Sequence, residues 1–156
     1  MRLIKLALLS FVFLFLVVTA ISLMIPSNIR ISKAVNIAPP RDSVLALIKN
    51  TERWPQWHPA FMKQDSFRSI LSILITPITE NDYEVVFRLQ QPNRPAVVNG
   101  WKIYEHGPTD SLTLQWYMDF KLKWYPWQKF GSLLYEGSFG TMMEQGLTNL
   151  KNASHK

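Results

Sequence analysis

An apolar run near the N-terminus is the feature that most constrains this chain of 156 residues. From Leu6 to Ile25, 17 of 20 residues are apolar and none is charged. About 20 apolar residues in a helix cross the hydrocarbon core of a bilayer, so the run predicts one transmembrane helix. We therefore expect two parts: a membrane anchor over residues 1–28 and one folded domain over residues 29–156.

Two other interpretations of this run stay open. Val18-Thr19-Ala20 fits a signal-peptide cleavage site, although the apolar residues continue past it and signal peptides usually have a shorter apolar core. A buried core helix is the second alternative. Basic residues precede the run (Arg2, Lys5) and also follow it, so they favour a cytoplasmic N-terminus only slightly. We expect a single-pass membrane protein whose folded domain lies on the extracytoplasmic (periplasmic) side.

The composition excludes several kinds of chemistry. The chain has no Cys, which excludes disulfides, thiolate metal sites and a cysteine nucleophile. Its three His residues lack the spacing of a metal site. The first Gly is Gly100, and the segment Glu136–Gly140 lacks the first Gly of a nucleophile elbow. The sequence therefore predicts no metal, no cofactor and no catalytic motif.

The formal charge of +6 is scattered, apart from one local basic cluster. Lys121, Lys123 and Lys129 alternate there with Trp124 and Trp127. Such a cluster suits either a nucleic-acid surface, or a solvated strand edge or face resting near anionic lipid. We favour the second interpretation and expect no nucleic-acid partner, because a membrane-tethered domain rarely meets nucleic acid.

Hydrophobic periodicity predicts five strands. The segment from Ile29 to Ile37 alternates apolar with polar or small residues, as in a half-buried strand. We expect the others over residues 70–76, 83–90, 97–106 and 111–123. The last is the clearest, with Trp116 and Met118 on its apolar face and Tyr117 and Asp119 on its polar face. Short connections between these strands favour antiparallel pairing.

Helical patterns flank the strands. Pro39-Pro40 opens a short helix ending near Asn50, and the Trp54–Pro59 segment forms a tight turn with two Trp to bury. A C-terminal pattern contains two apolar stretches, Phe130, Leu133 and Leu134, then Met143, Leu147 and Leu150. Gly137 and Gly140 between them predict a kink or break. This order predicts an α+β fold with helices packed on one face of an antiparallel sheet.

Several of these segments resemble a known group of proteins. Val35–Pro40 with Val44 and Ile48, followed by Trp54-Pro55-Gln56-Trp57, resembles the opening of the polyketide cyclase/dehydrase and lipid-transport group, which belongs to the START-like (SRPBCC) superfamily. The stretches Trp116–Phe120, Trp124–Phe130 and Gly146–Lys151 are similar to a membrane-anchored bacterial branch of that group. The resemblance implies a helix-grip fold, in which a curved antiparallel sheet wraps a C-terminal helix around a cavity for an apolar ligand. The five strands and short final helix predict a smaller or more open cavity than is usual there.

This resemblance gives a functional hypothesis and two alternatives. We expect a membrane-tethered binding module for a lipid or other apolar small molecule, rather than an enzyme. The candidate cavity-lining residues are Trp57, Phe87, Trp101, Trp116, Met118 and Phe120. One alternative is a structural or interaction domain of the cell envelope in which the aromatic residues only fill a core. The other is a cyclase- or hydrolase-type enzyme with Tyr83, Tyr104, His106 or Asp119 as acid or base.

Overall fold

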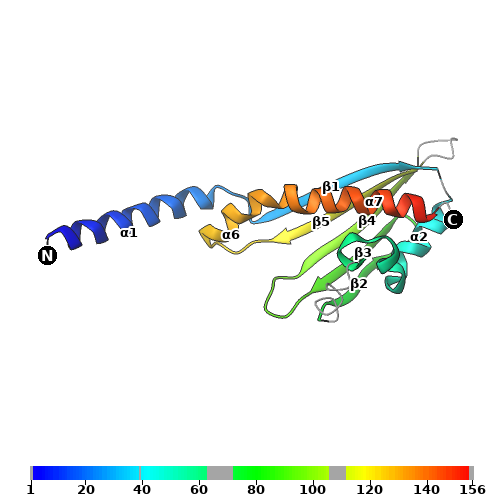
Figure 1. Cartoon of the computed structure of the whole chain (residues 1–156), viewed down its shortest axis with the longest axis horizontal. Helices are drawn as coiled ribbons and strands as arrows, with labels where there is room; N and C mark the ends of the chain where they lie inside the picture. The colour runs from blue at the N-terminus through cyan, green and yellow to red at the C-terminus, as the bar shows by residue number, and fades with distance from the viewer. Residues whose placement is uncertain (1, 39, 63–71, 106–111, 155–156) are drawn as a thin grey trace.

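A computed structural model describes residues 2–38, 40–62, 72–105 and 112–154. It shows an elongated molecule in which an apolar helix, α1 (Arg2–Leu23), projects from one end of an α+β domain (Figure 1). The 22 residues of α1 span about 33 Å at about 1.5 Å per residue, which matches a hydrocarbon core of about 30 Å. Among its residues only Ser22 is buried. The described chain thus contains one helix long and apolar enough to cross a membrane, and its exposure contradicts the core-helix alternative.

The domain is built on one antiparallel sheet of five strands, as the hydrophobic periodicity predicts. The strands are β1 (Asn28–Ile37), β2 (Leu74–Glu80), β3 (Glu84–Gln90), β4 (Val97–Glu105) and β5 (Leu112–Lys121). Their order in the sheet is β1-β5-β4-β3-β2. β2 lies a few residues later than expected. Residues 70 and 71 of its expected range lie outside the described residues, as do residues 106 and 111 at the ends of two other expected strands.

Helices cover one face of this sheet. The described helical segments of the domain are α2 (Arg41–Lys49), η1 (Thr51–Arg53), α3 (Trp54–Trp57), α4 (Pro59–Met62), α6 (Pro126–Gly131), η2 (Ser132–Leu134), η3 (Glu136–Gly140) and α7 (Thr141–Ser154), of which α6 contacts α1. α7 packs along β1 and against α2, α3 and α4 (Figure 1). The expected tight turn is present, and Trp54 and Trp57 are fully buried in it. These findings confirm the predicted α+β class.

The two C-terminal apolar stretches have different environments. Met143, Leu147 and Leu150 face the sheet and are buried. Leu133 and Leu134 are 65% and 72% exposed instead. The predicted irregularity between the stretches is the π-helical segment η3, which adds residues to a helical turn and so changes the face that each stretch presents.

The contact between α7 and the sheet depends on a glycine. A Cβ atom at Gly146 would lie 2.5 Å from Cζ3 of Trp116 and 3.0 Å from Cδ of Pro59. Trp116 is fully buried, so its ring has no free space into which to move. Gly146 is therefore the point at which the helix backbone rests on the indole of Trp116 in β5.

We expect Gly146→Ala to lower the free energy of unfolding by about 1–3 kcal/mol, because overpacking outweighs the better helix propensity of alanine. The matched control is Gly131→Ala in α6. Gly131 has helical dihedral angles (φ −59°, ψ −31°) and no atom within 4 Å of an added Cβ, so this variant should be as stable as the wild type or slightly more so. Urea unfolding of the full chain in detergent measures both, and equal destabilisation of the two variants would contradict the packing argument.

Candidate ligand pocket and the aromatic cluster behind it

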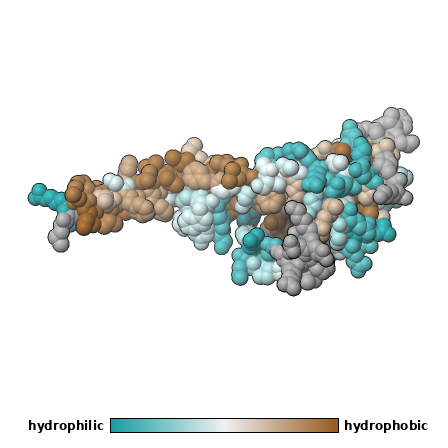
Figure 2. Space-filling model, viewed as in Figure 1, coloured by the Kyte–Doolittle hydropathy of each residue, from teal (hydrophilic) through white to brown (hydrophobic). Residues whose placement is uncertain are grey.

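The domain contains a partly enclosed hollow of about 490 Å³ at the end that adjoins α1. Its apolar lining comes from strands β3 to β5, from Leu122 just after β5 and from the helical segment above them: Leu89, Val97, Met118, Phe120, Leu122, Tyr135 and Phe139. Its polar residues include Gln91, Arg94, Lys121 and Gln128. Figure 2 shows brown, hydrophobic residues at the bottom of a notch beside the loop between β3 and β4.

Strand register explains where this hollow forms. Side chains alternate between the faces of a strand, so Val97, Asn99 and Trp101 of β4 all point to the face covered by α7. Val97 pairs with Phe120 of β5, and Trp101 pairs with Trp116. Large indoles thus fill the middle of the interior, whereas the smaller Val97 leaves space near the end of the sheet.

The roof of the hollow is aromatic. The ring centroid of Phe120 lies 5.0 Å from that of Tyr135 and 4.8 Å from that of Phe139. Tyr135 precedes the π-helical segment, which contains Phe139. The irregular helix therefore turns both rings toward the end of β5.

An aromatic cluster fills the interior behind the hollow. Its members are Trp54, Trp57, His58, Phe61, Phe87, Trp101 and Trp116, all buried. The stacked rings of Trp101 and Trp116 form its centre, with centroids 5.4 Å apart. Among the six predicted lining residues, Met118 and Phe120 line the hollow, and Trp57, Phe87, Trp101 and Trp116 belong to this cluster. Contact of these six with a ligand stays a prediction.

The cluster also holds polar atoms that lack hydrogen-bond partners among the described residues. They are Nε2 of His58, Nδ2 of Asn99 and Nε1 of Trp101. A buried donor without a partner costs about 1–3 kcal/mol. Asn99 is fully buried, its Oδ1 accepts a hydrogen bond from Nε1 of Trp116, and it pairs with Met118 in the strand register. Both N–H donors of its amide nitrogen are therefore unpaired, beside Met118, which lines the hollow.

Sequence reasoning did not single out Asn99. The available signal was local: a polar residue at a position of β4 whose neighbours two residues away, Val97 and Trp101, are apolar. A polar residue at a core-facing position of a strand is uncommon unless it has a specific partner.

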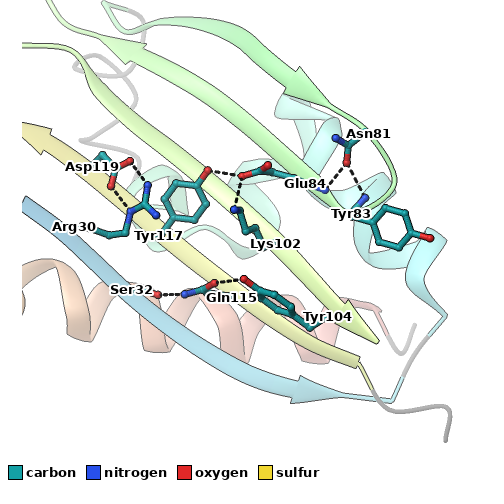
Figure 3. Close-up of polar contacts among 10 residues, drawn as sticks. All are labelled: Arg30, Ser32, Asn81, Tyr83, Glu84, Lys102, Tyr104, Gln115, Tyr117 and Asp119. Carbon is teal, nitrogen blue, oxygen red and sulfur yellow. Dashed lines mark hydrogen bonds and ion pairs between the residues drawn. The ribbon is translucent and has the colours of Figure 1, made fainter. Parts of the chain in front are cut away.

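The acid–base candidates of the enzyme alternative lie apart from the hollow. Asp119 forms a bidentate ion pair with Arg30, with distances of 2.6 and 2.7 Å, on the face of the sheet opposite α7 (Figure 3). The hydroxyl of Tyr104 donates to Gln115 on that same face. Tyr83 is 58% exposed at the start of β3, and His106 lies outside the described residues. The structure brings none of the three described candidates to the hollow.

Tyr117 is buried on this outer face, where the sequence pattern predicts a polar surface. Its hydroxyl donates to Oε1 of Glu84 at 2.8 Å, and the guanidinium of Arg30 lies 4.4 Å from its ring centroid (Figure 3). The ring occupies the space above Gly100, where an added Cβ would clash with it. Burial and the hydrogen bond to Glu84 raise the pKa of Tyr117 above its usual range, so the phenol stays protonated and links β5 to β3.

Comparisons with known proteins bear on the fold. No family model and no curated protein match the chain. Solved structures do match: the di-domain ARO/CYC protein StfQ from the steffimycin biosynthetic pathway has a TM-score of 0.60, with 8% identity over 82% of this chain and 51% of that chain. The di-domain ARO/CYC protein BexL from the BE-7585A pathway gives 0.55, with 10% identity over 83% and 51%. An uncharacterised protein from Bacillus thuringiensis gives 0.55, with 12% identity over 82% and 100%.

The domain has a helix-grip fold. The long C-terminal helix against an antiparallel sheet and the likeness to ARO/CYC domains agree on this point, as the sequence resemblance implies. The chain spans about half the length of the two di-domain proteins. At identities of 8–12% the likeness concerns the fold alone.

The helix-grip domain should lose stability on mild acidification because of His58. Burial lowers the pKa of His58 from 6.5 to about 3, so the unfolded chain takes up a proton at this residue from about pH 6.5 downward and the folded chain does not. The free energy of unfolding therefore falls as the pH is lowered, by at most about 1.4 kcal/mol per pH unit from this residue.

His58→Asn tests this dependence. Nδ1 of His58 accepts a hydrogen bond from the amide of Ala60, and the side-chain oxygen of Asn can replace that acceptor without titrating. We expect the variant to take up about one proton fewer on unfolding at the acidic end of the range from pH 7 to 5. Its unfolding free energy should therefore depend less steeply on pH than that of the wild type. Urea unfolding of the full chain at several pH values measures it, and an unchanged slope would show that His58 is not the buried titrating group.

Proposed function

We propose that the protein is a membrane-tethered binding module for a lipid or another apolar small molecule, which it holds in the hollow of its helix-grip domain. In this proposal α1 crosses the membrane, and the domain lies on the extracytoplasmic side. The observation that carries the proposal is the apolar hollow of about 490 Å³ at the end of the domain next to α1.

The size and lining of the hollow support this class of ligand. Ligand pockets have volumes of about 300–1,000 Å³ and are mostly apolar, with a few polar groups that orient the ligand. Here Leu89, Met118 and Phe120 provide apolar surface, and Arg94 and Lys121 provide positive charge. An acyl chain or apolar ring system fits the apolar surface, and an acidic headgroup fits the positive charge.

The alternatives account for less of the structure. A filled core explains the tryptophan cluster but leaves the hollow without a role. The ARO/CYC neighbours favour a cyclase only through their fold. The acid–base candidates that the structure describes lie away from the hollow.

Photolabelling of the full chain in vesicles tests the proposal. The vesicles contain phosphatidylcholine and phosphatidylglycerol, with a trace of either a phospholipid or a fatty acid that carries a diazirine near the end of its acyl chain. After illumination and proteolysis, mass spectrometry locates the label. We expect label in α1 and, separately, in the segments around Met118–Leu122 and Tyr135–Phe139 that line the hollow.

Two neighbouring residues of β4 provide a matched pair of variants. Val97→Phe places a ring in the hollow, whereas Val98→Phe places the same ring on the opposite face of the strand. Val97→Phe should reduce pocket labelling several-fold and leave labelling of α1 unchanged, and Val98→Phe should change neither. Label confined to α1 in the wild type, with both probes, would refute ligand binding in the hollow. Equal pocket labelling in the two variants would refute it as well.

A further inference from the structure

Exposed apolar side chains gather at the end of the domain next to α1. We call this set the tip surface: Trp124, Trp127, Phe130, Leu133 and Leu134. Trp127 is 65% exposed and Leu134 is 72% exposed, although both belong to the folded domain. In Figure 2 brown surface runs from α1 to the adjoining end of the domain, where α6 contacts α1. An apolar surface of this kind in contact with water indicates an interaction site.

A buried lysine fixes the tip surface to the end of α1. Lys129 of α6 is 2% exposed, and its Nζ donates hydrogen bonds to the carbonyl of Ile25 at 2.6 Å and to Oγ of Ser27 at 2.8 Å. These acceptors directly follow α1, where the carbonyls of a helix end attract a cation. The amide of Leu122 also donates to the carbonyl of Ser27. These bonds thus hold α6 at a fixed position along the axis of α1, beside the C-terminal end of that helix.

This position along the axis of α1 corresponds to the membrane interface. If α1 fills the hydrocarbon core, as its length of about 33 Å allows, Ile25 lies at its edge and α6 lies beside it. Trp and Tyr prefer this depth in membrane proteins. The exposed side chains of Lys121 and Lys123 stand next to Trp124, where they suit anionic headgroups.

We propose that the tip surface docks on the headgroup region of an anionic bilayer and turns the mouth of the hollow toward the membrane. This inference rests on the membrane tether of the proposed function. Its occupant is the lipid bilayer, since the tip surface is continuous with α1 and flanked by cations. Leu122 and Gln128 lie in the same segment and line the hollow, so an acyl chain leaving the bilayer at this point has only a short path to the pocket.

The distribution of tryptophans makes docking measurable. Four of the six, Trp54, Trp57, Trp101 and Trp116, are buried in the domain core. The other two, Trp124 and Trp127, belong to the tip surface. The full chain is reconstituted into phosphatidylcholine–phosphatidylglycerol vesicles that contain lipids brominated at a shallow or a deep position of the acyl chain. Bromine quenches only tryptophans close to it.

We expect the shallow bromine to quench part of the emission, bounded by the share of two tryptophans in six. The deep bromine should quench less. Trp124→Phe/Trp127→Phe should remove most of the quenching, because the remaining tryptophans lie in the core and only a brominated chain held in the hollow would approach them. Far-UV circular dichroism of the variant in detergent checks that the domain is folded.

A second pair of variants keeps all tryptophans. Leu133→Glu/Leu134→Glu adds charge to the tip surface and should reduce the quenching, whereas Ile78→Glu, at an exposed apolar residue of β2, should leave it unchanged. Docking would be refuted if the wild type shows no quenching, or if quenching is equal after Trp124→Phe/Trp127→Phe. Either result would indicate that a second copy of the chain or another protein covers the tip surface instead. If quenching is absent while the pocket residues are photolabelled, docking is wrong and the proposed function stands.

Discussion

The contact of Gly146 with the indole of Trp116 is the constraint on which the rest of this structure depends. It lets the backbone of α7 lie on the sheet, and it holds Trp116 against Trp101 in the centre of the interior. Aromatic rings packed at this distance leave little free volume, since protein interiors are packed as densely as organic crystals. The free space of the domain is therefore displaced to the end of the sheet near α1, where Val97 and Phe120 face Tyr135 and Phe139.

The interior is thus divided into a filled part and an open part, and three buried polar atoms of the described residues lack a hydrogen-bond partner. His58 and Trp101 each have one unpaired polar atom in the filled part. Asn99 lies between the two parts: its oxygen is paired with Trp116, and its amide nitrogen is unpaired. An apolar residue at this position would leave the buried indole N–H of Trp116 without its hydrogen-bond acceptor, so Asn99 has a structural role as well.

Local patterns predicted the elements of this fold well, and long-range packing determined what the sequence could not predict. Five strands, their antiparallel pairing and the buried turn at Trp54 follow from the hydrophobic period and from prolines. The position of the hollow does not, because it depends on which side chains from β4, β5 and the π-helical segment meet. Tyr117 is buried although it belongs to a polar face, since Gly100 on the neighbouring strand leaves room for its ring. Leu133 and Leu134 have a helical pattern like that of the core residues in α7. The π-helical segment η3, which lies between these two leucines and α7, explains why they are exposed.

The topology of the sheet explains why α1, the tip surface and the hollow share one end of the domain. β1 begins directly after α1, and its first residue, Asn28, pairs with Lys121, the last residue of β5. An antiparallel pair of this kind necessarily places the end of α1 beside the segment that follows β5, which is α6. The hollow opens at the same place, because the inner face of β5 ends there and the sheet is no longer covered by the aromatic cluster. The hydrogen-bond register that pairs β1 with β5 thus brings the hollow to the end of the domain that adjoins α1.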